Sequence, residues 1–201
     1  MTPQQLGFDG FDVPQPVRRH RLFFAAMPDP ATAARAAQVA ESLRGAMHVN
    51  ARPLRTERLH VSLCALGDFV QLPDAVVARA RAAAAAIDAP PFGVTFDRVG
   101  SFNGRDGHWP WVLTGSDGTN ELIGFEQRLA RVLKAAGLVR RTRARFTPHL
   151  TLLYGETRID PRAIEPVAWT VREFLLIHSW LGETRYDVAG RWSLPGGGRT
   201  D

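Results

Sequence analysis

The sequence predicts a fold of mixed strands and helices in which two similar lobes form one folded unit. Two observations lead to this prediction. The chain has 201 residues, of which 45% are hydrophobic, and such a chain can build one sizeable core or two small lobes that share one. A unit of strand, helix and second strand also occurs twice, in residues 21–67 and in residues 109–155. Because the two units are similar, we expect the lobes to be related by a pseudo-twofold axis.

Hydrophobic periodicity assigns the individual elements. Strands are expected where apolar residues alternate or form a short β-branched run, and helices where they recur every three to four positions. The expected strands cover residues 21–27, 58–67, 92–102, 109–115, 149–155, 168–179 and 186–194. The expected helices cover residues 28–45, 73–88 and 119–137, with Gly45 and Gly137 ending the first and the last. The last helix is expected to bury Leu122, Phe125, Leu129, Val132 and Ala136.

The two ends of the chain differ in composition from the rest. Residues 1–18 are polar with scattered glycine and proline, so we expect a flexible extension there, a single two-lobed domain over residues 19–195, and a flexible tail over residues 196–201. No apolar run is long enough to cross a membrane, and a signal-peptide pattern is missing. Cys64 is the single cysteine, which excludes an internal disulfide. Together these features predict a cytoplasmic protein.

The charge of the chain says little by itself. The net charge is +5, and arginine supplies nearly all of the positive charge. Arginine suits bidentate contacts to phosphate, so an anionic substrate is plausible. A codon usage that favours arginine and alanine explains the same composition equally well.

Two short motifs, RLHVSL and TPHLTL, share one layout. Each places a histidine two residues before a hydroxyl, giving the pairs His60 with Ser62 and His149 with Thr151. In a strand, residues i and i+2 point to the same side of the sheet. The apolar neighbours of the pairs are expected to be buried on the opposite side; they are Val61, Leu63, Leu150 and Leu152. If a twofold axis relates the lobes, both polar pairs can point into one cleft.

Two imidazoles and two hydroxyls in one cleft would suit phosphodiester chemistry. Imidazole titrates near neutral pH, so one ring can act as base while the other donates a proton. The hydroxyls can bind non-bridging phosphoryl oxygens, and the reaction needs no metal.

Other interpretations of the same residues compete with this one. A lone histidine on a strand is commonly structural, and we expect His20, His48, His108 and His178, which have no partner motif, to be structural or surface residues. A zinc site could draw on His60, His149, His108 or His48, although the spacing fits zinc sites poorly. Cys64 is expected on the strand face of His60 and Ser62, so a Cys/His nucleophile is conceivable; a small packing residue is the favoured interpretation.

The motifs and their surroundings resemble the two-histidine phosphoesterase superfamily, and within it the 2′-5′ RNA ligase-like, RNA 2′,3′-cyclic phosphodiesterase family. The resemblance covers about residues 20–194 and includes RLFFAAM, VGSF, ELIGFEQRLARVLKAAG and IHSWLGETRYDVAGRWSL. It implies an α+β fold with two pseudo-symmetric lobes. Each lobe would be an antiparallel sheet with helices on the outside, and the lobes would surround a central active-site groove.

The resemblance also implies an activity and roles for residues. His60 and His149 would be the acid/base pair, and Ser62 and Thr151 would bind the phosphate. In the usual assignment His149 activates water and His60 protonates the leaving 3′-oxygen. The expected substrate is an RNA end with a 2′,3′-cyclic phosphate, opened to a 2′-phosphate. Some family members also join 2′-5′ linkages. No cofactor, metal or obligate protein partner is expected.

The sequence departs from the family at one position. Many relatives carry an arginine five residues after the second histidine, where this chain has Tyr154. Arg143 or Arg145 could supply the missing charge. Phe102, Trp109 and Trp111 could stack on a base. Two alternative functions therefore stay open: a phosphodiesterase for a small cyclic or 2′-5′ linked nucleotide, and a non-catalytic module that binds nucleotides or RNA.

Overall fold

Two four-stranded antiparallel sheets form the framework of the protein. A computed structural model describes residues 17, 19–139 and 146–195. Sheet A has the strand order β2-β1-β7-β8, and sheet B has the order β5-β4-β3-β6. The strands of sheet A are β1 (His20–Ala26), β2 (Val61–Phe69), β7 (Glu173–Trp180) and β8 (Arg185–Ser193). The strands of sheet B are β3 (Phe92–Ser101), β4 (Trp109–Thr114), β5 (Leu150–Gly155) and β6 (Arg162–Val171). The expected α+β class is confirmed.

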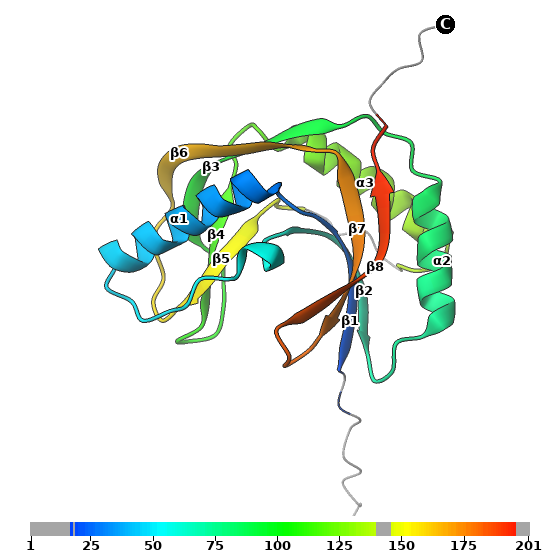
Figure 1. The fold of residues 1–201 in the computed structure, drawn as a ribbon, viewed down its shortest axis with the longest axis horizontal. Helices are drawn as coiled ribbons and strands as arrows, with labels where there is room; N and C mark the ends of the chain where they lie inside the picture. The colour runs from blue at the N-terminus through cyan, green and yellow to red at the C-terminus, as the bar shows by residue number, and fades with distance from the viewer. Residues whose placement is uncertain (1–16, 18, 140–145, 196–201) are drawn as a thin grey trace, which may run out of the picture.

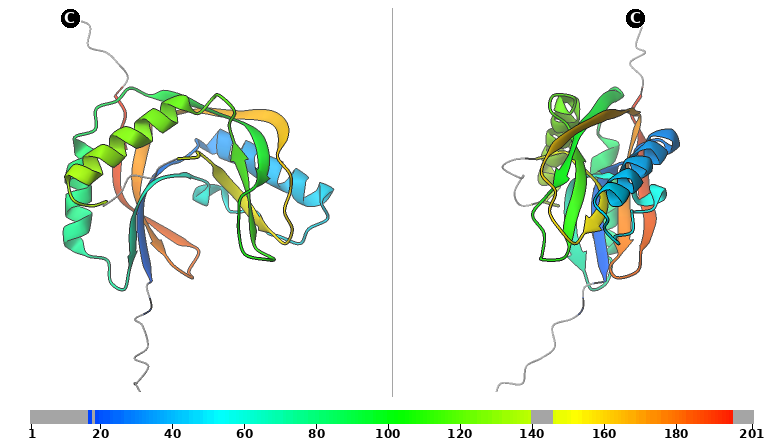
Figure 2. Two further views of the ribbon diagram at one scale, coloured as in Figure 1. Left: turned by 180° about the vertical axis from the view of Figure 1, so that it is seen from behind. Right: turned by 90° about the vertical axis from the view of Figure 1, so that its left-hand side faces the viewer.

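The two sheets have matching connectivity. In sheet A, helix α1 (Pro30–Ala46) connects β1 to the edge strand β2, and in sheet B, helix α3 (Asn120–Ala135) connects β4 to the edge strand β5. Both strands that follow a histidine motif are therefore edge strands. Figures 1 and 2 show the sheets as the two limbs of an arch. The repeated unit and the two-lobed arrangement expected from the sequence are confirmed.

Helices α1 and α3 join the two sheets because each contacts the lobe in which it does not begin. Helix α1 follows β1 of sheet A, yet Thr32 Oγ1 donates to the carbonyl of Ala168 in sheet B at 3.4 Å. Helix α3 follows β4 of sheet B, yet it contacts β2 of sheet A. Helix α2 (Asp74–Ala85) packs against α3 and β8, where Arg81 Nε donates to the carbonyl of Ala189 at 2.6 Å. One main apolar cluster consequently runs through both sheets and all three helices.

A second, smaller apolar cluster covers the other face of sheet A. Phe23, Ala25, Leu175 and Ile177 are buried there, at most 4% exposed. Their neighbours along β1, Leu22 and Phe24, belong to the main cluster on the opposite face, as strand alternation requires. We call the face that carries the smaller cluster the inner face of sheet A.

The strand expected over residues 168–179 is two strands, which corrects the sequence prediction. β6 ends at Val171 in sheet B and β7 begins at Glu173 in sheet A, so the chain crosses between sheets at Arg172. The apolar pattern runs through this crossing without glycine or proline to mark it. β6 also begins six residues earlier than expected, and it contains Pro166. Proline is tolerated because β6 is an edge strand.

The helix ends agree with the sequence in part. Gly137, with φ +68°, directly follows the end of α3 as expected, and the Leu138 amide closes the turn onto the Leu133 carbonyl at 2.9 Å. Gly45 does not end α1, because the helix continues to Ala46. On α3, Leu133 is fully buried and Val132 only half-buried, so the apolar face is rotated slightly from the expected one.

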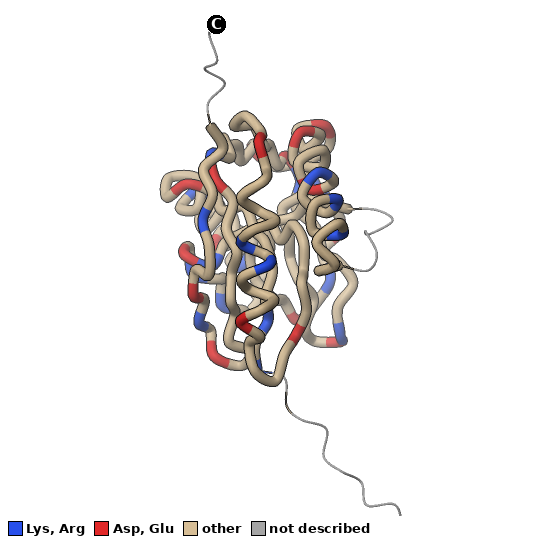
Figure 3. Tube along the Cα trace, turned by 90° about the vertical axis from the view of Figure 1, so that its right-hand side faces the viewer, with Lys and Arg blue, Asp and Glu red and all other residues tan. Residues whose placement is uncertain are grey.

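Charges are mixed over the surface that carries α2. Figure 3 shows basic and acidic positions interspersed among the described residues on this side of the molecule. Among the described residues, no helix has both the length and the apolar character needed to cross a membrane. The predicted extension and tail lie outside the described residues, apart from Val17.

Gly155 provides a test of the packing beside the second motif. Trp111 is fully buried and its indole Nε1 donates to the carbonyl of Thr157 at 2.9 Å. A Cβ on Gly155 would lie 2.5 Å from that Nε1 atom, so Gly155→Ala should lower the free energy of unfolding by about 1–3 kcal/mol in urea titrations. The control is Gly124→Ala on the exposed side of α3, where nothing lies within 4 Å. It should raise stability by about 0.5–1 kcal/mol. Equal stability of the two variants would contradict the packing.

Candidate active site

The two motif histidines are held by the same hydrogen bond. His60 and His149 each lie one residue before their strand, outside the sheet ladder. His60 Nδ1 bonds the carbonyl of Arg58 at 2.7 Å, and His149 Nδ1 bonds the carbonyl of Thr147 at 2.9 Å. A carbonyl oxygen can only accept, so Nδ1 carries the hydrogen in both rings. In the neutral imidazole, Nε2 is then the unprotonated nitrogen.

The hydroxyl of the first motif lies beside this nitrogen. Ser62 Oγ is 3.0 Å from His60 Nε2, so in the neutral ring the hydroxyl donates and Nε2 accepts. The expected same-side arrangement of this pair is therefore present. Ser62 pairs with Ala25 of β1, which places it on the inner face of sheet A. Thr151 holds the corresponding half-buried position in the second motif and pairs with Val112. We call the sheet face that carries Thr151 the inner face of sheet B.

A bulge follows the hydroxyl in both strands. Between Ser62 and Ala65, β2 advances three residues while β1 advances two, from Ala25 to Phe23. Between Thr151 and Leu153, β5 advances two residues while β4 advances one. Each strand thus carries one extra residue, which bends it and changes the alternation of faces. The two motifs share one burial sequence: buried, half-buried, buried, buried, exposed.

The first bulge corrects the sequence expectation for Cys64. Simple alternation put Cys64 on the face of His60 and Ser62, but the extra residue turns it into the main apolar cluster. Its Sγ donates to Glu126 Oε1 of α3 at 3.6 Å, and it is 6% exposed. A Cys/His nucleophilic pair is therefore excluded by position, and Cys64 is the packing residue that was favoured. The four apolar neighbours of the motifs are buried as expected.

Aromatic side chains flank both imidazoles. Phe23 and Tyr186 pack on His60, with ring centroids 5.1 and 5.6 Å away. Phe102, a predicted site residue, packs on His149 at 4.7 Å. The sequence analysis missed Phe23 and Tyr186. Phe23 lies in a continuous apolar run that does not show which residues face inward, and Tyr186 comes from the far edge strand.

The environment of His60 lowers its pKa below the ordinary value. Burial of the ring is the largest cause, and the positive charges of His149 and Arg58 act in the same direction, while the hydrogen bond to the Arg58 carbonyl opposes them. The effect of His149 means that the two imidazoles lie within electrostatic range of each other. The backbone brings them together: the Leu54 amide, shortly before the first motif, donates to the carbonyl of Leu152 in the second at 2.7 Å.

Tyr154 lies on the inner face of sheet B with Thr151. It pairs with Pro110, two residues from the Val112 partner of Thr151 on β4. The tyrosine is 43% exposed. Its ring stacks on the His108 ring, with the two centroids 4.4 Å apart and an angle of 4° between the ring planes. It also contributes to the electrostatic environment of Arg21 on sheet A. Tyr154 therefore shares a sheet face with Thr151, and its contact with a substrate stays a prediction.

The remaining candidates are placed differently. Trp111 is 0% exposed and cannot stack on a base, which corrects that expectation. Trp109 is half-buried beneath Arg158, whose guanidinium lies 5.1 Å from the ring centroid. Arg143 and Arg145 lie outside the described residues. Within the described residues, no three histidine, cysteine, aspartate or glutamate side chains gather in a way that could hold a metal ion.

The histidines without a motif occupy other places. His20 and His178 bond each other at 2.9 Å, and His178 is 7% exposed. They belong to β1 and β7, on the face opposite the smaller apolar cluster. This fits the structural role expected for them.

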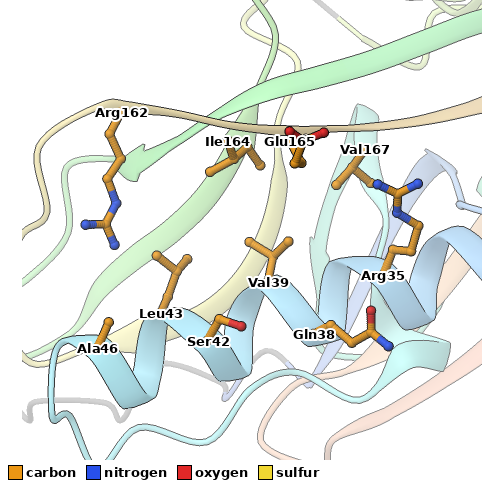
Figure 4. A pocket seen from close by; sticks show the side chains of 10 residues that line it. All are labelled: Arg35, Gln38, Val39, Ser42, Leu43, Ala46, Arg162, Ile164, Glu165 and Val167. Carbon is orange, nitrogen blue, oxygen red and sulfur yellow. The ribbon is translucent and has the colours of Figure 1, made fainter.

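A cavity of about 430 Å³ lies away from both motifs, between α1 and β6 (Figure 4). Arg35 and Arg162 stand near its two ends, and Val39, Leu43 and Ile164 line its middle. None of the four motif residues reaches it. We therefore place the chemistry at the inner faces, where the imidazoles and hydroxyls are, and not in this cavity.

The electrostatic contact between the two imidazoles can be measured by NMR. The C–H signals of the His60 ring should titrate with a midpoint below the ordinary value of 6.5. Replacing His149 with glutamine removes a positive charge that disfavours the His60 imidazolium, so the midpoint should move upward. His48→Asn is the control, since His48 is exposed and has a φ of 51° that asparagine tolerates. An unchanged His60 midpoint in His149→Gln would show that the rings do not sense each other.

Comparison with known proteins agrees with this geometry. The family model of the 2′-5′ RNA ligase superfamily matches residues 28–183. The structure of TT0787 from Thermus thermophilus is similar with a TM-score of 0.66 and 23% identity, covering 88% of this chain and 99% of the other. E. coli LigT complexed with 3′-AMP has a TM-score of 0.64 and 24% identity over 89% and 99% of the chains. LigT in apo form has a TM-score of 0.62 and 26% identity over the same shares.

No curated protein matches the sequence. The family match covers most of the chain and includes both histidine motifs with the strands that follow them. The chain therefore belongs to the 2′-5′ RNA ligase superfamily, a branch of the two-histidine phosphoesterases.

Proposed function

We propose that this protein is a metal-independent phosphodiesterase that opens 2′,3′-cyclic phosphates at RNA ends to give 2′-phosphomonoesters. One observation carries the proposal: both motif imidazoles are fixed through Nδ1 to a backbone carbonyl, and the charge of His149 acts on His60. Both rings are thus anchored through Nδ1, and in the proposed mechanism Nε2 of each ring transfers a proton to or from the same phosphoryl group.

The proposed reaction uses the two Nε2 atoms in opposite directions. His149 Nε2 accepts a proton from water as the water oxygen bonds to phosphorus. The bond from phosphorus to the 3′-oxygen breaks, and His60, doubly protonated in the complex, donates its Nε2 proton to that oxygen. The product carries a 2′-phosphate and a 3′-hydroxyl. Ser62 and Thr151 hold non-bridging oxygens. A ribose 5′-hydroxyl in place of water would form a 2′-5′ linkage by the same step.

The lowered pKa of His60 is compatible with its role as acid once substrate is bound. In the free protein, burial and two positive neighbours favour the neutral ring. A phosphodiester anion beside the ring reverses the sign of the local charge and favours the imidazolium. We therefore expect His60 to take up a proton as substrate binds. His149 completes the proposed pair as base.

A small nucleotide is the second candidate substrate. The observation that favours it is the stack of His108 on Tyr154 at the inner face of sheet B, which forms a compact aromatic surface. E. coli LigT, which has the same fold, has been crystallised with 3′-AMP and with ATP, so a mononucleotide fits at least one structural relative.

Activity should depend on both histidines and on no metal. We expect wild-type protein to hydrolyse an oligonucleotide with a 2′,3′-cyclic phosphate end in the presence of EDTA. His60→Ala and His149→Ala should each lower kcat by about 10²–10⁴-fold, because each removes a proton-transfer group. His48→Asn again serves as the control and should keep full activity. Full activity in either alanine variant would contradict the assigned roles.

The substrate class is decided by a panel assayed side by side. It contains the cyclic-phosphate oligonucleotide, a mononucleoside 2′,3′-cyclic phosphate, and a 2′-5′ linked dinucleotide. The highest kcat/KM for the oligonucleotide supports the RNA-end proposal, and the highest value for a small substrate supports the second candidate. Tight binding of AMP or RNA with no turnover of any substrate would instead identify a binding module.

The pH dependence of turnover tests for two titrating imidazoles. One ring must be neutral and the other protonated, so kcat/KM should rise and then fall with pH in a bell-shaped profile. The measurement covers pH 5 to pH 9 at constant ionic strength, with substrate far below KM. Each alanine variant should lose one limb of the bell. A flat wild-type profile over this range would rule out the two-imidazole mechanism.

A further inference from the structure

Arg58 occupies an unusual place beside the first motif. It is the last residue of the 3₁₀ turn η1 (Thr56–Arg58) and lies two positions before His60. Its guanidinium carbon lies 4.6 Å from the centroid of the Tyr186 ring. That ring stands edge-on to His60, with centroids 5.6 Å apart. A positive charge is thus held against an aromatic ring that also contacts the catalytic imidazole.

One hydrogen-bond donor of Arg58 is unmet among the described residues. Its Nε is buried and has no hydrogen-bond partner among the described residues. The nearest carboxylate in sequence, Glu57, faces Arg55 at 3.8 Å instead. A buried guanidinium donor without an acceptor is costly, and such groups in native proteins call for an explanation.

A second arginine at the inner face of sheet A, Arg21, has a structural role and serves as a comparison. Arg21 of β1 makes a bidentate pair with Asp68 of β2, with Nε and Nη2 at 2.7 and 2.8 Å from the two carboxylate oxygens. Its charge and donors are satisfied by the protein itself. Arg58 has the same fork of donors but no carboxylate facing it in the described structure.

We infer that Arg58 is a substrate-binding residue, whose guanidinium takes an oxygen of the phosphoryl group bound at His60 and Ser62. This inference rests on the proposed function, because it concerns the same phosphoryl group. The planar fork of arginine matches phosphate oxygens and gives short, charge-assisted hydrogen bonds. Tyr186 holds the fork in place before the ligand arrives, so little side-chain freedom is lost on binding. Tyr154 supplies no charge from the opposite lobe, so Arg58 provides it from sheet A.

The test measures binding of inorganic phosphate, separately from turnover. Phosphate is titrated into wild-type protein and variants while the ring signals of His60 are followed by NMR. Arg58→Met keeps the length of the side chain and removes the charge. It should weaken phosphate binding by about 10- to 100-fold, the loss expected for a charged hydrogen bond. Arg58→Lys keeps the charge but not the planar fork of donors, so its affinity for phosphate should lie between those of the wild type and Arg58→Met.

Arg55→Met is the matched control. Arg55 directly precedes the same turn, carries the same charge, and is exposed. The Arg55→Met variant should bind phosphate with the same affinity as the wild type. An equal loss in both methionine variants, unchanged binding in Arg58→Met, or no phosphate binding by the wild type would each overturn the inference.

Thermal unfolding separates a binding role from a structural one. Because the Arg58 Nε has no protein partner among the described residues, Arg58→Met should unfold at the same temperature as wild type or a higher one. A large drop in the unfolding temperature with phosphate binding retained would make Arg58 structural. If Arg58→Met does not fold, Arg58→Lys carries the comparison with Arg55→Met. Phosphate binding that needs Arg58, without hydrolysis of any cyclic phosphate, would leave this inference standing and remove the proposed activity.

Discussion

The hydrogen bond from each motif histidine to the backbone carbonyl two residues earlier is the interaction on which the site depends. It selects one neutral tautomer, since a carbonyl oxygen can only accept, and it fixes the ring against its own chain. It is available because His60 and His149 lie just before their strands, where the carbonyls of Arg58 and Thr147 are not used by the sheet. Identical anchoring makes the two imidazoles equivalent in orientation. Their surroundings then make them different: two aromatic rings enclose His60, and Phe102 packs on His149.

The edge position of β2 and β5 lets the two motifs approach each other. An edge strand has free backbone groups, and in β5 these are met by the segment that leads to the first motif, at Pro53 and Leu54. The helices also hold the two lobes together. α1 leaves sheet A and contacts β5 and β6 of sheet B, and α3 contacts both β3 of sheet B and β2 of sheet A. The lobes therefore share one main core and cannot move apart without exposing it. The bulge after each hydroxyl then bends the strand and turns a following residue, Cys64 in β2 and Leu153 in β5, into the main apolar cluster.

The motif spacing was enough to predict the repeated unit, the histidine-hydroxyl pairs and the burial of Val61 and Leu150. These follow from the period of two in a strand, which sequence shows directly. A bulge inserts one residue without changing composition, so Cys64 was assigned to the wrong face. The crossing at Arg172 was missed because the strands on both sides of it, β6 in sheet B and β7 in sheet A, are rich in apolar residues, so the sequence pattern does not change where the chain passes between sheets. Arg58 could not have been singled out among so many arginines, since its distinction is a buried Nε without a partner among the described residues and the presence of Tyr186, which lies 128 positions along the chain.

The inner face of sheet A is built with a positive charge that the described part of the protein does not balance. Arg21 there is matched by Asp68, while the buried Nε of Arg58 has no partner among the described residues. The pKa of His60 is lowered by burial of its ring and, in addition, by the positive charges of His149 and Arg58. Each of these features is unfavourable in the free protein, and each is relieved by one negative group placed between the imidazoles. An anion would accept from Arg58, favour the His60 imidazolium, and screen His60 from His149. Stability given up in the free state thus becomes affinity for an anionic ligand, as at many functional sites. A neutral ligand could accept a hydrogen bond from Arg58 but would bring no negative charge to His60, so an anionic ligand such as the proposed phosphate is the one that we expect at this face.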